Sequence, residues 1–381
     1  MSGFFPDIRA AEGALQQEAF TRWQEMGDLR RRETWRWTPL DALRDDARRI
    51  EGADYQFDLP DAIGEDFGTF TEADRALLAL DDAAFAALNL ALLPDALLLT
   101  VPDGADCADI AALNIDLLAR RLQPSRIHIR AGKNSRSAFW IDYRVSRKGA
   151  QLPVITVNAE DRAQIDVALW FHGDAGTAQV AQAAVQQATD SRVRINALQA
   201  GGDLLRLDIH SELHGEGTHF AFGGVQLLAG SQIGDYHLNV RHLTENSESH
   251  QRVRGALDDA ALGIFDGMIY VAHGAQKTDA RQDSRYILLA DSARSHSVPR
   301  LEIYADDVQC AHGSTTGRLD PDALFYLQSR GISLENARKM LILSFLHEAV
   351  VIEHPAILDA VHDSISRDWL GDNNEDAPDA A

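Results

Sequence analysis

The sequence is poor in cysteine and in positive charge, and it has no long hydrophobic run. Its 381 residues include only two cysteines, Cys107 and Cys310, which form no disulfide framework and fit a reducing compartment. The 36 basic residues are outnumbered by 58 acidic ones, which gives a formal net charge of −22 at pH 7. Because nucleic acids and anionic membranes attract basic surfaces, we expect neither as a partner.

Signals for export and for membrane insertion are also missing. Residues 1–19 do not combine a basic segment with an apolar one, as a secretory signal would. The longest apolar runs, such as Ala83–Leu93, are too short and too interrupted to cross a bilayer. We therefore expect a cytoplasmic protein.

The common catalytic motifs are absent as well. The sequence contains neither a phosphate loop, nor a dinucleotide-binding glycine motif after a strand, nor a nucleophile elbow. His347 and Glu348 resemble the first half of a zinc-protease helix, but the position of the second histidine is Val351. We therefore expect a chain that is not an enzyme and that binds no nucleotide itself.

Residues 1–95 are expected to form a small helical domain. Apolar residues recur at helical spacing in this region, and Asp81 or Asp82 could cap the second half of its last helix. A segment with two tryptophans is followed by Pro39 and is expected to be extended. The expected helices are Ala10–Met26, Asp41–Ile50 and Thr71–Leu93, and the extended segment is Thr34–Trp37.

Residues 96–318 contain about a dozen short β-type runs, which is typical of a sandwich, a barrel or a solenoid. Three observations favour the solenoid. Tight Asn-Gly or Asp-Gly hairpin signals are scarce, comparable strands recur every 20 to 30 residues, and glycines follow many strands. The glycines expected at corners are Gly215, Gly217, Gly223, Gly224, Gly230 and Gly234.

Residues 319–371 are expected to be helical. Asp320 followed by Pro321 is a typical helix start, and Gly331 is a typical stop. Ser333 begins a second helix, up to about Val350, whose apolar residues lie nearly all round it. Such a helix is buried in its own domain or docked on a partner.

The chain ends in one further helix and an acidic segment. We expect a third helix from Pro355 to about Trp369. Residues 372–381 are acidic and have the composition of a disordered tail.

Cys310 and His312 form the most informative pair in the sequence. In an extended strand, residues i and i+2 point to the same face, so a thiol and an imidazole could reach one metal ion. The alternative is that Cys310 is a small buried hydrophobic residue. Because two ligands do not complete a tetrahedral site, a metal here needs further donors or a second chain.

The surroundings of this pair resemble a known family. Residues 301–320 and 323–332, which include Cys-Ala-His-Gly at Cys310–Gly313, resemble the SufB/SufD family of iron–sulfur cluster assembly proteins. The resemblance is closest over residues 217–350 and most like the SufD branch. SufB-like members have a Glu-His-Glu sequence here and a functional cysteine upstream, near Ser284 of this chain.

The resemblance implies a mainly β fold, a right-handed parallel β-helix flanked by helical ends. It implies a SufD-like subunit of the SufBCD complex, pairing edge-on with a SufB-like scaffold. The C-terminal helices would dock a SufC-like ABC ATPase, in which nucleotide hydrolysis resides. A homodimer could form in isolation.

The same resemblance implies site residues and a cargo. A transient iron or iron–sulfur cluster, shared with SufB, would be bound by His312, with Cys310 as a second ligand. Reduced flavin is possible in the complex. The residues expected to contact SufC are Phe325, Tyr326, Arg330, Met340, Leu341 and Phe345, and those expected at the SufB interface are Tyr304 and His296.

Two alternatives belong to other classes. A carbohydrate-active β-helix would use paired carboxylates, but Asp306 and Asp307 are adjacent and would face opposite sides of a strand. A purely structural interaction protein would keep Cys310 and His312 as core residues.

Overall fold

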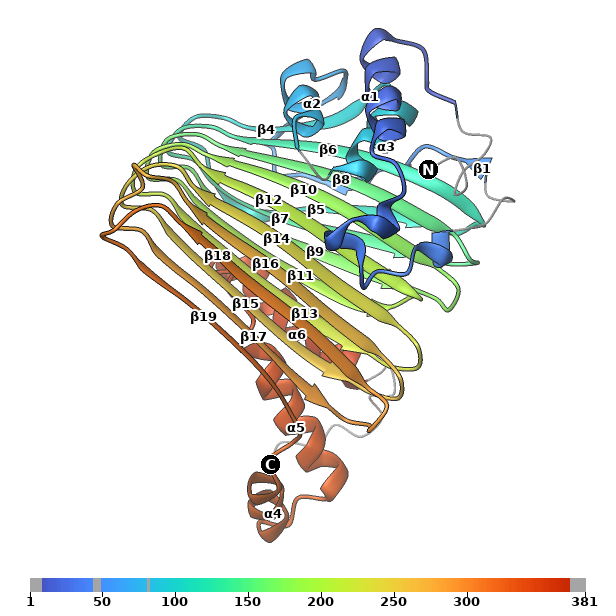
Figure 1. Cartoon of the computed structure of the whole chain (residues 1–381), viewed down its shortest axis with the longest axis vertical. Coiled ribbons are helices and arrows are strands. Elements are labelled where there is room, and N and C mark those ends of the chain that lie inside the picture. The colour runs from blue at the N-terminus through green and yellow to red at the C-terminus, as the bar shows by residue number, and fades with distance from the viewer. Residues whose placement is uncertain (1–8, 44–48, 81–82, 371–381) are drawn as a thin grey trace.

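The computed structural model describes residues 9–43, 49–80 and 83–370, and its centre is a parallel β-solenoid of about eight turns (Figure 1). Each turn gives one strand to each of two sheets, which we call sheet A and sheet B. In spatial order, sheet A contains β18 (Arg294–Ile303), β16 (Leu262–Val271), β14 (Ile233–His242), β12 (Leu204–Leu213), β10 (Ala178–Gln187), β8 (Ala150–Ala159), β6 (Arg121–Ala131), β4 (Ala96–Val101) and β3 (Gly64–Gly68), with β1 (Arg49–Ile50) beside β6. Sheet B contains β19 (Gln309–Gly317), β17 (Asp279–Leu288), β15 (Glu248–Leu257), β13 (His219–Leu228), β11 (Arg192–Gly201), β9 (Gln164–Gly173), β7 (Arg136–Val145), β5 (Asp106–Leu117) and β2 (Gln56–Asp58). The predicted β-helix is confirmed.

Successive turns stack in register, so equivalent side chains form rows along the solenoid. Alternate residues of each strand point between the sheets, where apolar rows exclude water. One such row in sheet B consists of Phe139, Val167, Ile195 and Phe222, all buried. The same row continues through positions 251 and 282 to position 312.

The corners between strands require left-handed backbone at several positions. Gly217 and Gly230 have φ of 68° and 61° at corners, as the sequence predicts. Gly223, Gly224 and Gly234 lie inside strands instead. Their lack of a side chain makes room for neighbouring groups, so the assignment of these three glycines to corners is wrong.

The N-terminal helices cover part of the outer face of sheet A (Figure 1). They are α1 (Ala14–Glu25), α2 (Thr71–Leu78) and α3 (Ala84–Leu92), with short 3₁₀ helices at Leu29–Arg31, Glu33–Trp35 and Leu40–Leu43. Trp23, Trp35 and Leu88 pack in one cluster with Leu152 and Val180 of the sheet. This burial of aromatic surface joins the N-terminal region to the solenoid.

Several N-terminal predictions are wrong. Thr34–Trp37 is not extended, because Trp35 turns inward as part of a 3₁₀ helix and is buried. In Asp41–Ile50 the described residues form a 3₁₀ turn and the strand β1, with residues 44–48 outside the described part. Thr71–Leu93 is divided into α2 and α3, and the proposed caps Asp81 and Asp82 lie outside the described residues. The region is also not purely helical, because β2 and β3 pair antiparallel with β5 and β4.

The C-terminal helices are α4 (Pro321–Ser329), α5 (Leu334–His347) and α6 (Pro355–Leu370). Their predicted caps are present, because Asp320 and Ser333 accept backbone hydrogen bonds and Gly331 has a φ of 87°. Helices α5 and α6 pack on the outer face of sheet B, while α4 projects beyond the solenoid (Figure 1). The predicted disordered tail, residues 372–381, lies outside the described residues.

The positions of the strands and the lengths of the helices can be compared with the predicted domain boundaries and with the needs of a membrane-spanning helix. The predicted boundaries at residues 95 and 318 fall beside the first and last long parallel strands, but independent folding of the parts stays a prediction. In the ranges that the structure describes, no helix combines the length and the apolar character that a membrane crossing demands.

Candidate functional site

The solenoid ends at β18 and β19, each of which has a neighbouring strand on one side only. The residues of β17 that face between the sheets, Ala280, Gln282 and Ser284, are buried. Their register partners on β19 are Cys310, His312 and Ser314, which lie at the open end of the solenoid. The predicted pair therefore ends two adjacent inward-facing rows of sheet B, where an extra turn would otherwise follow.

Cys310 is half-buried in this open end. It packs beside a small apolar cluster that includes Val271, Ala280 and Ala305. Burial, and then the negative charge of Asp279, raise the pKa of the Cys310 thiol. The thiol is therefore protonated at neutral pH and becomes a good metal ligand only when a cation displaces its proton.

His312 is exposed, in contrast to the residues that precede it in its row. Its register partner Gln282 is buried behind it. An exposed imidazole can coordinate a metal without a conformational change, so His312 is more accessible than Cys310.

Hydroxyl groups connect the two sheets at the same end. Ser284 and Ser297 lie 2.8 Å apart between their Oγ atoms, and Ser295 and Thr316 approach within 2.7 Å. Ser284, near which the resemblance places the functional cysteine of SufB-like sequences, is buried and hydrogen-bonded. This turn therefore offers hydroxyl groups in place of a thiol.

The donors at the open end do not complete a metal site. Over the described residues, no group of three or more His, Cys, Asp or Glu side chains is arranged to hold a metal ion. Asp306 and Asp307 lie in the exposed connection between β18 and β19, not in the row of Cys310. Any site built on Cys310 and His312 needs donors from elsewhere.

Tyr304 and His296, the residues predicted at a partner interface, lie near this end on different surfaces. Tyr304 follows β18, is exposed, and has ring contacts with Tyr270 and His273. His296 points out of sheet A and stacks on Trp37 at a centroid distance of 4.4 Å. No sequence pattern predicts that Trp37, in the N-terminal segment, contacts the last strand of sheet A.

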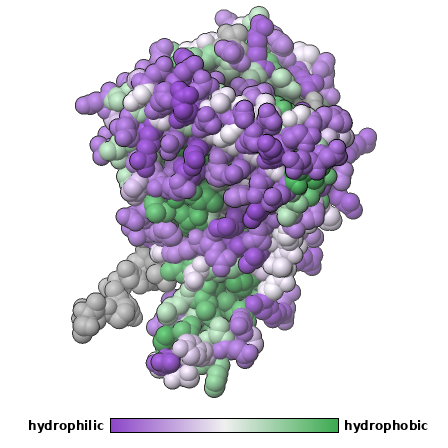
Figure 2. All heavy atoms as spheres, turned by 90° about the vertical axis from the view of Figure 1, so that its left-hand side faces the viewer, coloured by the Kyte–Doolittle hydropathy of each residue, from purple (hydrophilic) through white to green (hydrophobic). Residues whose placement is uncertain are grey.

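The predicted ATPase-contact residues divide into exposed and packed groups. Phe325 and Met340 are 72% and 51% exposed, and Tyr326 is exposed with Arg330 against its ring. Figure 2 shows hydrophobic surface at the end of the molecule where α4 and α5 lie. Leu341 and Phe345 are half-buried, and Phe345 packs against the sheet near Arg254.

Because Phe345 is partly buried, it is a poor position for a mutation that tests the predicted ATPase-contact surface. Replacement of Phe345 would disturb the packing of α5 on sheet B as well as any partner contact. Phe325 and Met340 are therefore the better positions, because their side chains make little contact within the chain.

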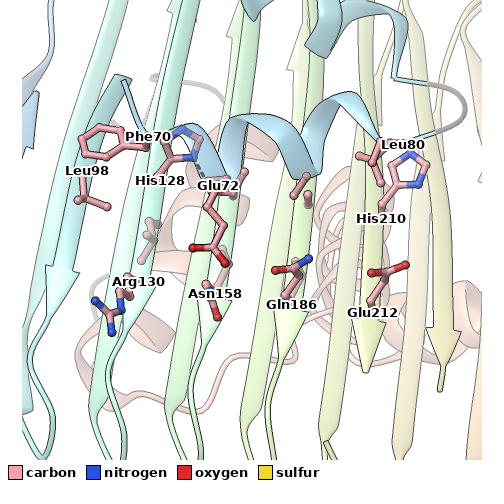
Figure 3. Close-up of a pocket in the computed structure, with 18 of the residues that line it drawn as sticks. Phe70, Glu72, Leu80, Leu98, His128, Arg130, Asn158, Gln186, His210 and Glu212 are labelled. Carbon is pink, nitrogen blue, oxygen red and sulfur yellow. Dashed lines mark hydrogen bonds between the residues drawn. The ribbon is translucent and has the colours of Figure 1, made fainter. Parts of the chain in front are cut away.

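A hollow of about 670 Å³ lies elsewhere, between α2 and the outer face of sheet A. Figure 3 shows α2 crossing the strands above His128 and His210, with a second polar row below that includes Arg130 and Glu212. None of the cluster-binding or partner-contact residues predicted from the sequence lines this groove.

A buried ion pair holds α2 over the groove. Asp74 of α2 is buried and lies 3.1 Å from both Arg126 and His128. The opposite charges offset the desolvation of each group. We interpret this contact as structural.

Comparison with known proteins identifies relatives. The model of the family described as "SUF system FeS cluster assembly, SufBD core domain" matches residues 115–345, more than half of the chain. SufD of Escherichia coli K12 is 33% identical over 161 residues, 42% of this chain and 38% of the relative. SufD of Bacillus subtilis 168 is 36% identical over 140 residues, which are 37% of this chain and 32% of the relative. A SufBD family protein of Synechocystis is 34% identical over 169 residues, which are 44% of this chain and 37% of the relative. The aligned regions thus span about a third to two fifths of these relatives' lengths.

Proposed function

The chain belongs to the SufBD core family of the SUF iron–sulfur cluster assembly system and is most like SufD, and we propose that it pairs with a SufB-like scaffold and docks a SufC-like ATPase. The observation that carries this proposal is the open end of the solenoid. Two strands with a free edge each, β18 and β19, meet there, and β19 carries Cys310 and His312 at successive inward-facing positions. A second β-helix can pair with such edges and supply the missing donors.

Iron, or a nascent cluster, is the cargo in this proposal. His312 binds it through a neutral ring nitrogen, and Cys310 joins as a thiolate once its proton is displaced. The scaffold contributes the remaining ligands and delivers sulfur that a cysteine desulfurase has released. In this proposal the chain supplies metal-ligand donors and does not itself catalyse a reaction.

The exposed end formed by α4 and α5 is the proposed ATPase contact. Its apolar side chains Phe325, Tyr326 and Met340 are exposed in the free chain, as expected of a surface that a partner covers. Closure of a pair of ATPase subunits would move α5, and through its packing on sheet B would move the open end. Nucleotide binds the ATPase in this scheme, and reduced flavin, where it is present, belongs to the cytoplasmic complex.

Co-expression with SufB-like and SufC-like partners tests the cargo site. The complex with His312→Ala should assemble normally and lose most of its iron and acid-labile sulfide after reconstitution. His214→Ala is the matched control, because His214 is an exposed histidine paired with Glu212 away from the open end. Unchanged iron and sulfide in the His312→Ala complex would remove His312 from the proposal.

A second variant tests the ATPase surface. The double substitution Phe325→Glu and Met340→Glu should abolish capture of the SufC-like partner while leaving the SufB-like partner bound. Leu118→Glu is the control, because Leu118 is also an exposed apolar residue but lies on the solenoid. Retention of the ATPase by the double variant would refute the docking assignment.

A further inference from the structure

Glutamine side chains form hydrogen-bonded ladders inside the solenoid. Gln179 donates from Nε2 to Oε1 of Gln151 at 2.7 Å, and Gln151 donates to Gln123 at 2.8 Å. The same contact joins Gln226 to Gln199, and Gln282 to Gln251, each at 2.9 Å. In every pair the glutamine of the later turn donates through Nε2, and the Oε1 of the glutamine in the preceding turn accepts.

The last of these ladders ends directly behind His312. Gln251 and Gln282 are buried in the sheet B row whose next member is His312. Within the described part of the chain, Oε1 of Gln282 is buried and has no hydrogen-bond partner. A buried acceptor without a partner is costly, and the next side chain in the row carries ring N–H groups.

We propose that Gln282 is the positioning residue for His312, with its Oε1 accepting the N–H of one imidazole nitrogen. This inference rests on the proposed function. A carbonyl oxygen can only accept, so the bond fixes which ring nitrogen is protonated and turns the other lone pair toward the open end. Metal-binding histidines commonly have such a partner on their second nitrogen, and it orients the ring.

The chain supplies a matched control for this proposal. Gln226 is also the buried last member of a glutamine ladder, and its Oε1 is likewise without a partner. The next residue in its row, however, is Gly255. Gln226→Met therefore removes the same ladder contact with no imidazole to affect, whereas Gln282→Met removes it behind His312.

The first readout does not involve iron. Nitrogen-15 NMR of histidine-labelled full-length chain should show one ring tautomer for His312 in the wild type and in Gln226→Met. Gln282→Met should give the mixture of an unrestrained imidazole, and Gln282→Glu, which retains an acceptor, should restore one tautomer. Thermal unfolding of each variant confirms that it is folded. A wild-type mixture, or a single tautomer in Gln282→Met, would overturn the proposal.

The second readout links the tautomer to the cargo. In the complex with both partners, Gln282→Met should weaken iron uptake by about 10-fold to 100-fold, and Gln282→Glu should recover it. If His312→Ala leaves iron uptake unchanged, the proposed function fails while the tautomer result still stands. If His312→Ala abolishes uptake but Gln282→Met does not weaken it, only the positioning role is refuted.

Discussion

At the scale of single residues, the solenoid interior holds polar groups whose partners are also inside. His242, at the end of β14, is buried with Ser247 Oγ 2.7 Å from its Nδ1 and Ser249 Oγ 2.9 Å from its Nε2. Burial lowers the pKa of His242 from 6.5 to about 4. The neutral ring is therefore part of the folded state, and its protonation opposes folding.

This burial predicts a specific acid sensitivity. Below pH 6.5 His242 becomes protonated in the unfolded chain, whereas in the folded chain it stays neutral until about pH 4. Between these values the free energy of unfolding should fall by about 3 kcal/mol from this group. Urea titrations at several pH values should show that fall in the wild type and less of it in His242→Gln. Equal pH slopes for both proteins would contradict the assignment.

The thiol of Cys310 gives a second prediction at this scale. Because its pKa is raised, little thiolate exists at neutral pH, and alkylation should be slower than that of a free small thiol. The rate should rise as the pH passes above the ordinary value of 9.0. Iodoacetamide kinetics in a Cys107→Ser background would measure it. Rapid modification at pH 7 would indicate an activated thiol instead.

At the scale of elements, sequence patterns predicted the long C-terminal helices and most strands, but not the polar ones. β10 and β15 are rich in Gln, Ala, Ser, His and Arg, and their β-branched residues are only Val180, Val185 and Val253. They become strands because their backbones pair with neighbouring turns and because the ladders bond buried amide atoms such as Gln179 Nε2 and Gln251 Oε1. Those long-range contacts are invisible in local propensity. The pairing of Cys310 with His312 was predictable from spacing, whereas Gln282 and Trp37 were not.

The packing of α5 and the segment after it on sheet B depends on Gly223. A side chain at Gly223 would place Cβ within 1.9 Å of the carbonyl oxygen of Ala349, just after α5. Asn196 donates to this same oxygen at 3.0 Å and accepts from the backbone N–H of Val351 and Ile352. Sheet B and the segment after α5 thus meet with no space for a methyl group.

Gly223→Ala should therefore loosen the C-terminal helices while the solenoid stays folded. Limited proteolysis should cleave the variant within residues 334–370 faster than the wild type, with a destabilisation of about 1–3 kcal/mol, as expected of overpacking. Gly274→Ala is the control, because nothing lies within 4 Å of its added Cβ. Equal cleavage of the two variants would show that the contact can relax.

At the scale of the whole molecule, the open edges are the feature that partners should change. The outward backbone N–H groups of β18 and β19 lack a neighbouring strand, so they should exchange rapidly in a free monomer. Binding of the SufB-like partner should protect residues 294–303 and 309–317, while β11 in the middle of sheet B should not change. Hydrogen–deuterium exchange with mass spectrometry measures both. Protection confined to α4 and α5 would place the scaffold elsewhere.

The two ends of the solenoid differ, and this difference limits how far association can go. At the N-terminal end the sheets finish in the short antiparallel strands β2 and β3, whereas the other end finishes in the long strands β18 and β19. Short edge strands are poor templates for a further chain. If the free edges of β18 and β19 pair with a second chain as proposed, the two chains would form a closed pair, because the short strands at the other end are poor sites for adding a third chain.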